Sequence, residues 1–273
     1  MVRTNPQKER RKTSNKSKMA KDLSFWAHLD ELRVVLVKSL CLWGVATVCA
    51  FCFKEPLFDI LFAPSQPDFF LYRGLCYLAR ITGWSVLCRE SVHVAFINTE
   101  LTAQFMTHLQ VSMFAGLTIA LPFIVYWIYG FVSPALYARE RRYGVALVLL
   151  SFGLFALGVG LNYALIFPFS FRFLGTYQVA SFVVNQISLS SYVSLFLVLS
   201  VLLGLLFEVP VLTWFLSRMG ILRREHLRQY RRHVFVLILI LAAVITPTGD
   251  PFTLLLVTAP VYLLYELSIA IIR

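Results

Sequence analysis

Residues 190–217 read SSYVSLFLVLSVLLGLLFEVPVLTWFLS, an apolar stretch in which Glu208 is the single charged residue. An α-helix needs about 20 apolar residues to cross the roughly 30 Å of hydrocarbon in a bilayer. This stretch is long enough to do so, and it has no polar face to present to water. It therefore predicts a transmembrane helix and decides the fold class of the chain.

Comparable apolar stretches occur along the rest of the chain. Of its 273 residues, 59% are hydrophobic and 14% are charged, whereas a soluble domain carries about 25% charged residues. We therefore expect an all-α integral membrane protein with six spans. The predicted spans cover residues 34–53, 105–132, 144–167, 190–217, 233–247 and 252–272.

The first 22 residues differ from the rest in composition. They are rich in Lys, Arg, Ser and Asn and have no apolar face to bury, so we expect residues 1–22 to form a disordered basic tail. Residues 23–273 would then form one membrane domain. Within it, residues from about 54 to 104 make a long outer segment after the first span.

The distribution of Lys and Arg predicts the orientation. With the N-terminus in the cytoplasm, most of the 25 basic residues fall on the cytoplasmic side, as the positive-inside rule requires. Both termini are then cytoplasmic. The net charge of +11 is mainly a topology signal and not a sign of nucleic-acid binding, and the cations would face anionic lipids. The basic residues left outside are Lys54, Arg73, Arg80, Arg89 and Arg172.

Glu208 is an ionisable residue inside a predicted transmembrane span, where such residues are rare. It precedes Arg218 by ten residues, which is about 15 Å of helix, so it lies near the middle of the membrane. Pro210 lacks an amide donor and leaves the carbonyl of Leu206 without its helical partner. Glu208 could be a protonated contact between helices of this chain. We favour a contact with a polar residue on the transmembrane helix of a partner.

Acidic residues also occur among the cytoplasmic cations. Asp30 and Glu31 precede the first span, and Glu140 lies beside Arg141 in the loop between the second and third spans. Local charge balance is one explanation. The other is a docking site for a cationic peptide, which would prefer Arg to Lys because a carboxylate binds guanidinium in bidentate geometry.

The fifth predicted span is short. Its apolar core, residues 234–245, amounts to about 18 Å of helix, less than the hydrocarbon thickness. A thinner bilayer or a turn below the lipid surface would have to accommodate it. Asp250 follows in a turn rich in Pro and Gly and could cap the sixth span. Glu266, near the C-terminus, is expected close to the interface.

Two cysteines lie in the outer segment. Cys76 and Cys88 could form a disulfide if that side of the membrane is oxidising. The sequence contains no HExxH motif, phosphate-binding loop or GxSxG elbow. We therefore expect no enzyme activity, no cofactor and no metal site.

The unusual positions occur in an order that resembles the TatC family of the twin-arginine protein translocase. The resemblance covers nearly all of the chain after the tail. The matching motifs are His28-Leu29-Asp30-Glu31-Leu32-Arg33, Ala63-Pro64, FVSPALYARERR over residues 131–142, Phe167-Pro168, Phe207-Glu208-Val209-Pro210, Tyr230-Arg231-Arg232, Thr246-Pro247 with Asp250, and residues 260–266.

This resemblance implies a signal-peptide receptor and scaffold in the bacterial cytoplasmic (inner) membrane. It implies a concave, glove-shaped bundle of six helices with a periplasmic segment over residues 54–104. Folded proteins would be exported with the proton motive force as the energy source. The partners would be single-span TatA or TatB proteins, twin-arginine signal peptides and lipids, in an oligomeric complex.

The resemblance also implies roles for particular residues. Glu31 and Glu140, with Arg33 and Arg141 in the same motifs, would bind the signal peptide. Glu208 and Pro210 would meet a polar residue of the single-span partner. The structural positions would be Pro64, Pro134 and Asp250.

Some positions depart from the family pattern. Val35 stands where the family often has a second basic residue, and the turn TPTGD is one residue longer than the family's TPPD. Leu254 stands where the family has Gln, so a hydrogen bond to a partner is not expected there. Two competing functions are an ion-coupled small-solute transporter that uses Glu208 as proton carrier, and a structural scaffold without a ligand.

Overall fold

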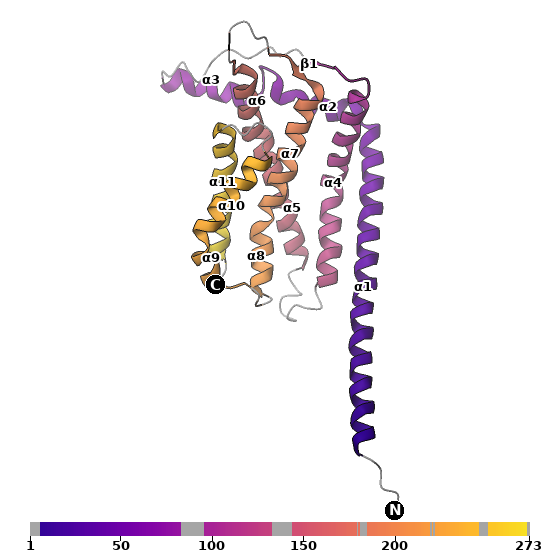
Figure 1. The fold of residues 1–273 in the computed structure, drawn as a ribbon. Helices are drawn as coiled ribbons and strands as arrows, with labels where there is room; N and C mark the ends of the chain where they lie inside the picture. Colours follow the sequence, from indigo (N-terminus) through magenta and orange to yellow (C-terminus); the bar gives the residue numbers. More distant parts are fainter. Residues whose placement is uncertain are drawn as a thin grey trace, which may run out of the picture.

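The computed structural model describes residues 6–82, 96–132, 144–178, 180, 185–218, 220, 222–245 and 251–271. These residues form a bundle of long helices with shorter elements across one end (Figure 1). The elements are α1 (Pro6–Cys52), α2 (Lys54–Phe62), η1 (Ala63–Ser65), α3 (Phe70–Thr82), β1 (Phe96–Ile97), α4 (Ala103–Val132), α5 (Gly144–Leu161), the π-helical turn η5 (Asn162–Ile166), α6 (Phe167–Thr176), β2 (Ile187–Ser188), α7 (Leu189–Phe207), α8 (Val209–Arg218), α9 (Arg224–Gln229), α10 (Arg231–Ile245) and α11 (Pro251–Ile271).

Five helical segments are long and apolar enough to cross a membrane, so the prediction of an all-helical membrane protein is confirmed. The structure places these segments where five of the six spans are predicted. They are His28–Cys52, Ala103–Phe131, Gly144–Thr176, Leu189–Arg218 and Thr253–Ile271.

The third segment is longer than the predicted 144–167. The helix continues through η5 into α6 because Pro168 falls in the first turn of α6, where a missing amide donor is tolerated. The fifth predicted span corresponds to α10. With 15 residues it is about 22 Å long, shorter than the hydrocarbon layer, so the count of six spans stays a prediction.

From Pro6 on, the N-terminal part is helical where the sequence predicts a disordered tail over residues 1–22, and the division into this tail and a membrane domain over residues 23–273 stays a prediction. In the structure α1 is helical from Pro6 and continues without a break into the first span. The residue types of this part include Lys, Arg, Gln, Met and Ala, which favour helices. An existing helix can be extended without a new nucleation step. The N-terminal part of α1 runs beyond the bundle (Figure 1).

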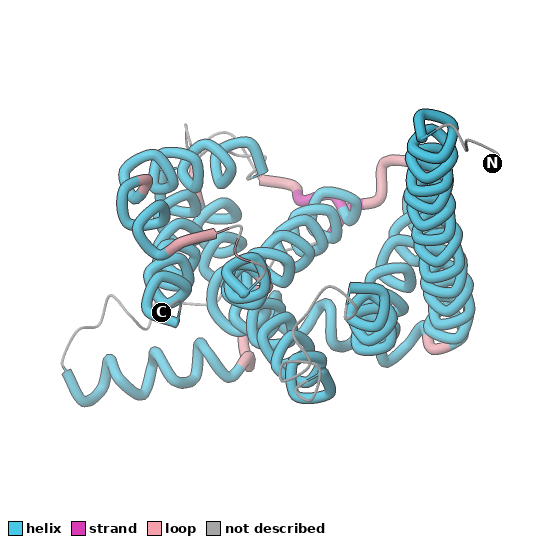
Figure 2. The backbone as a smooth tube through the Cα atoms, turned by 90° about the horizontal axis from the view of Figure 1, so that it is seen from below, coloured by secondary structure: helices cyan, strands magenta, loops and turns pink. Residues whose placement is uncertain are grey.

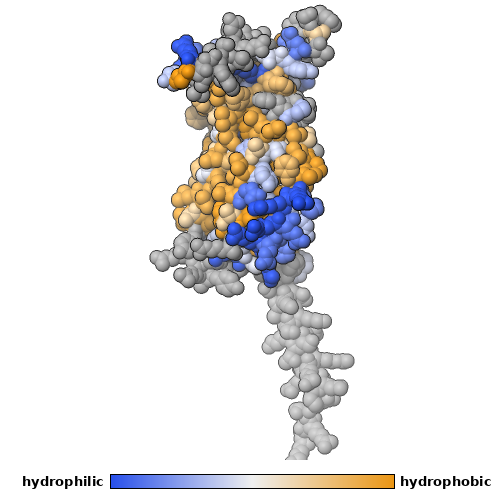
Figure 3. Space-filling view, turned by 90° about the vertical axis from the view of Figure 1, so that its left-hand side faces the viewer, coloured by the Kyte–Doolittle hydropathy of each residue, from blue (hydrophilic) through white to orange (hydrophobic). Residues whose placement is uncertain are grey.

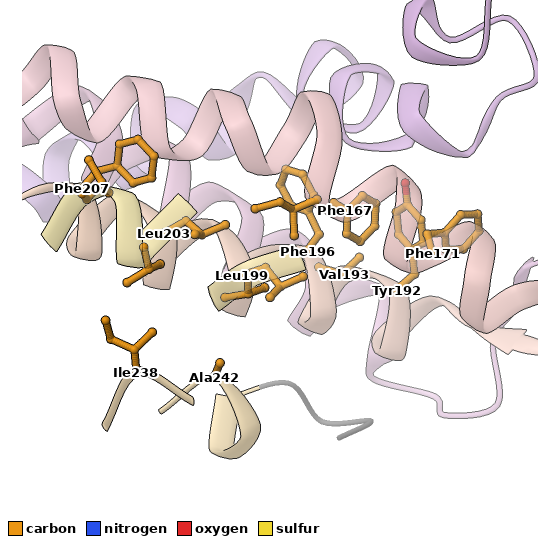
Figure 4. Packing of buried hydrophobic residues seen from close by; sticks show 14 of the residues in the cluster. Phe167, Phe171, Tyr192, Val193, Phe196, Leu199, Leu203, Phe207, Ile238 and Ala242 are labelled. Carbon is orange, nitrogen blue, oxygen red and sulfur yellow. The ribbon is translucent and has the colours of Figure 1, made fainter. Parts of the chain in front are cut away.

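The core of the bundle is built around α7. This helix contacts α4, α5, α6, α10 and α11. On one side the rings of Phe167 and Phe171 pack edge-on against Tyr192, with centroids 5.0 and 5.1 Å away. On another side Ile238 and Ala242 of α10 complete the buried cluster (Figure 4). The central position of α7 explains why its apolar sequence has no polar stripe.

Two glycines allow helices to approach closely. A Cβ atom at Gly158 of α5 would lie 2.6 Å from the carbonyl oxygen of Leu203 in α7. A Cβ atom at Gly116 of α4 would lie 2.6 Å from the backbone nitrogen of Thr47 in α1. Small residues of this kind let transmembrane backbones pack against each other.

The first helix lies at the edge of the bundle. It packs mainly on α4 and is seen apart from α10 and α11 in the view along the helices (Figure 2). Trp43 of α1 donates its indole N–H to the carbonyl of Met113 in α4, with a distance of 2.9 Å. Many apolar side chains of α1 are exposed, among them Val45 and Val48, as expected for a helix that faces lipid.

Candidate functional site

Glu208 lies in a break between two helices. The helix α7 ends at Phe207 and α8 begins at Val209. The amide of Glu208 donates to the carbonyl of Leu205, three residues back, over 3.1 Å. Pro210 has no amide hydrogen, so the regular helical bond to Leu206 cannot form. The break therefore follows from the sequence and exposes polar backbone inside an apolar segment.

The two carboxyl oxygens of Glu208 have different surroundings. Oε2 accepts a hydrogen bond of 2.6 Å from the hydroxyl of Ser151 in α5. Oε1 is buried, and none of the described residues donates to it. An acceptor that is buried without a donor costs free energy. Glu208 thus contacts another helix of its own chain through Oε2, while Oε1 is left without a donor among the described residues.

A groove lies on the side of α7 that faces α1 and α4. Its volume is about 550 Å³, and it lies between α1, α4 and α7. Apolar side chains make up most of its wall, together with Gln110 and Ser194. Leu205, three residues before Glu208, lines it as well.

Glu31 lies near the end of α4. The imidazole of His28 stacks on the ring of Phe131, with centroids 4.2 Å apart, and this contact joins α1 to the last turn of α4. Nδ1 of His28 is 3.8 Å from Oε2 of Glu31, and the Glu31 side chain is 54% exposed. Arg33 is exposed too. Glu31 can therefore reach a ligand in solution.

The loop after α4 carries the other residues expected to bind the signal peptide. Pro134, Glu140 and Arg141 lie outside the described residues, as does Asp250. The loop starts two residues after Phe131, which touches His28. Glu31 and the start of this loop are therefore at the same end of the bundle.

An ion pair joins α10 and α11 at this same end. Arg231 donates to Glu266 over 2.7 Å, and the hydroxyl of Tyr262 donates to the other carboxyl oxygen over 3.1 Å. The hydroxyl of Tyr265 donates to the carbonyl of Leu227 in α9 over 2.7 Å. Glu266 thus has partners within the chain, which the sequence did not predict.

We expect Arg231→Gln to destabilise the α10–α11 contact modestly. The two side chains are 40% and 32% exposed, so the pair should contribute about 0.5–1 kcal/mol. Denaturant unfolding in mixed micelles would measure this loss for Arg231→Gln, Glu266→Gln and the double variant. The losses should be less than additive; full additivity would show that the pair contributes nothing.

The α9 region also carries an exposed basic surface. Arg223, Arg224, Arg228 and Arg232 are exposed there. One face of the molecule shows a hydrophilic area near its lower end (Figure 3). An apolar belt covers the molecule above it. This order of polar and apolar surface matches a bilayer boundary, with cations at the level of lipid phosphates.

The outer segment is fixed to the opposite end of the bundle. Pro64 is buried in η1, and its carbonyl accepts from the hydroxyl of Tyr72 over 3.1 Å. Burial raises the pKa of the Tyr72 phenol, and the charge of Arg172 acts against this shift. Tyr192 of α7 donates to the carbonyl of Leu61 over 2.8 Å. The two hydroxyls donate hydrogen bonds to backbone carbonyls at the end of α2 and in η1. Carbonyl groups at such helix ends lack a backbone donor from the helix itself.

The cysteines of the outer segment are partly described. Cys76 in α3 is disulfide-bonded. Cys88, its predicted partner, lies outside the described residues, so the pairing of the two stays a prediction. The cysteines of α1, namely Cys41, Cys49 and Cys52, are free thiols.

Two polar contacts inside the bundle escaped the sequence analysis. Ser151 is the donor to Glu208, and Asn162 donates to the hydroxyl of Ser200 over 2.8 Å. Asn162 is fully buried and begins the π-helical turn η5. Single Ser and Asn residues in an apolar stretch are the sequence signal for such contacts.

The architecture and the buried carboxylate together define the class: an all-helical, multi-pass membrane protein that keeps an ionisable group within the apolar zone. The sequence model described as "Sec-independent protein translocase protein (TatC)" matches residues 27–260. The chain belongs to the TatC family.

Relatives and a solved structure agree with this assignment. The TatC protein of Blattabacterium sp. subsp. Periplaneta americana is 34% identical over 92% of this chain and 95% of its own length. The TatC protein of Deinococcus radiodurans is 36% identical over 90% of this chain and 84% of its own. The crystal structure of a twin-arginine translocase receptor TatC is 30% identical, with a TM-score of 0.71 over 89% of this chain and 97% of that one.

Family membership decides the biochemical class. The chain is a receptor component of the twin-arginine translocase, so it takes part in protein transport and is not a catalytic enzyme. Membership in the family also implies that the chain has partners within a Tat complex. The competing interpretation as a small-solute transporter is thereby set aside.

Proposed function

We propose that the chain binds twin-arginine signal peptides at the end of the bundle that carries Glu31 and the loop over residues 133–143. The observation that supports this most directly is the contact of His28 with Phe131. It holds an exposed carboxylate beside the helix from which the loop with Glu140 begins. Two carboxylates at one end suit two successive guanidinium groups, each bound by two parallel hydrogen bonds.

The proposal includes the topology inferred from Lys and Arg. The chain would cross the bacterial inner membrane six times, with α10 as the fifth span and both termini in the cytoplasm. Glu31 and the basic α9 region would then face the cytoplasm, where unexported precursors are found. Arg33 and Arg141 would bind the signal peptide together with Glu31 and Glu140, and Pro64, Pro134 and Asp250 would be structural.

A second part of the proposal concerns partners. The free oxygen Oε1 of Glu208 would accept a hydrogen bond from a polar side chain of a single-span TatA- or TatB-type protein. The partner helix would lie in the groove between α1, α4 and α7, which leads to Leu205. Several such units would form an oligomeric complex for export driven by the proton motive force.

A change in the peptide tests signal-peptide binding without altering this chain. A signal peptide with a photoreactive residue next to its paired arginines should crosslink to the chain in membrane vesicles. Replacing both arginines by lysine should lower the yield at least about tenfold, because the ammonium group cannot form the bidentate pair. Equal yields from the two peptides would contradict a carboxylate site that selects guanidinium.

A further inference from the structure

The helix α3 lies across the end of the bundle (Figure 1). Seen along the bundle, it projects past the neighbouring helices and away from them (Figure 2). The function proposed above leaves this helix without a role. Several apolar side chains of α3 are exposed in this position.

The beginning of α3 is fixed below the end of α6. The hydroxyl of Tyr72 donates to the carbonyl of Pro168 as well as to Pro64, over 3.3 Å and 3.1 Å. Pro168 precedes Thr176, the last residue of α6, by eight positions, which is about 12 Å of helix. Since α6 completes the membrane-length segment Gly144–Thr176, α3 starts beside that segment and not above it.

One face of α3 is apolar and exposed along its length. Phe70, Tyr77 and Ile81 are 57%, 67% and 65% exposed. Their spacing of seven and four residues puts them on one side of the helix, over about 16 Å. We call these three residues the α3 stripe. Ala79 is 5% exposed and lies on a different face.

Two arginines border the α3 stripe. Arg73 follows Phe70 by three residues and Arg80 follows Tyr77 by three, so each is next to the stripe on the helix surface. Arg73 is 3.5 Å from Asp68, but both side chains are largely exposed, at 70% and 81%. Such a pair is weak and leaves the guanidinium open to a phosphate.

We propose that α3 is an interfacial helix that binds the phospholipid leaflet at its end of the bundle. The α3 stripe lies among the upper parts of the acyl chains, and Arg73 and Arg80 bind lipid phosphates. A helix that leaves the bundle sideways at this depth has lipid beneath it, and its aromatic, apolar and basic residues are those that favour the interface. Cys76, in the middle of the helix, is disulfide-bonded.

Site-specific fluorescence in the full chain tests the proposal. Cys41, Cys49 and Cys52 are replaced by Ser, which leaves the disulfide of Cys76 in place, and Ile81→Cys is labelled with nitrobenzoxadiazole. The matched control is Arg80→Cys, one position earlier on the polar side. Both are reconstituted in phosphatidylcholine vesicles that contain phosphatidylglycerol.

We expect lipids with a spin label high on the acyl chain to quench the label at position 81 several-fold more than aqueous iodide does. At position 80 the order should be reversed. Phe70→Cys and Arg73→Cys form a second pair, which keeps the test valid if a new thiol at position 81 disturbs the disulfide. Changing both arginines to Gln should reduce quenching by the spin-labelled lipid at position 70.

Three results would overturn the proposal. Equal quenching by iodide at positions 70 and 73 would show that the α3 stripe faces water. Protection of position 70 from both quenchers would show that protein covers it. Unchanged lipid quenching after loss of both arginines would remove their binding to lipid phosphates.

Discussion

Replacing Glu31 with Gln is expected to weaken binding of a twin-arginine signal peptide at least about tenfold. The substitution keeps the size of the side chain but removes the charge that a guanidinium group needs for a strong bidentate contact, which is worth more than about 1.4 kcal/mol. The structure supports access to this carboxylate, since it is 54% exposed. Binding of a labelled signal peptide to the purified chain would measure the change.

Asp30→Asn is the matched control for this experiment. Asp30 is exposed and carries the same charge, but it points about 100° away from Glu31 around the helix. Its loss should change affinity less than about twofold, as expected from a distant and screened charge. Similar losses from both variants would mean that the peptide senses the overall charge of this region and not a site at Glu31. Glu140→Gln should behave like Glu31→Gln.

Replacing Glu208 with Ala is expected to reduce association with a single-span partner about tenfold while signal-peptide binding is retained. A hydrogen bond between transmembrane helices is worth about 1–2 kcal/mol. Oε1 of Glu208 has no donor among the described residues. Quantitative co-purification of the partner, together with peptide binding to the same preparation, would measure the two effects separately.

Ser151→Ala separates the two roles of Glu208. This variant removes the donor to Oε2 and leaves Oε1 unchanged. We expect a lower stability of the α5–α8 contact by about 1 kcal/mol and little change in partner association. If Ser151→Ala and Glu208→Ala reduced partner association equally, Glu208 would act by holding the bundle together.

Much of the architecture could be predicted because lipid imposes a simple length rule. An apolar stretch of sufficient length predicts a transmembrane helix, and five of the predicted spans coincide with membrane-length helices. The break at Glu208 follows from Pro210 through the missing amide donor. The third predicted span ends at residue 167, whereas Pro168 lies in the first turn of α6 and the helical segment continues to Thr176.

The partners of the polar residues could not be predicted in the same way. Which side chain of α5 meets Glu208 depends on how α5 and α7 are aligned, and that alignment depends on the close contact of Gly158 with Leu203. No local pattern encodes a contact between residues so far apart in sequence. The helices across the outer end were also missed, because segments such as α2 and α3 are too short for the length rule to detect.

The unequal attachment of α1 has a mechanical consequence. Near Gly116 the helix rests on α4 through Thr47. The hydroxyls of Tyr72, Tyr163 and Tyr192 join α2 and α3, which follow α1, to α6, η5 and α7. The N-terminal part of α1 extends past the bundle (Figure 1). A load on this overhang would act on the stacking of His28 on Phe131 before it reaches the seam between Gly116 and Thr47.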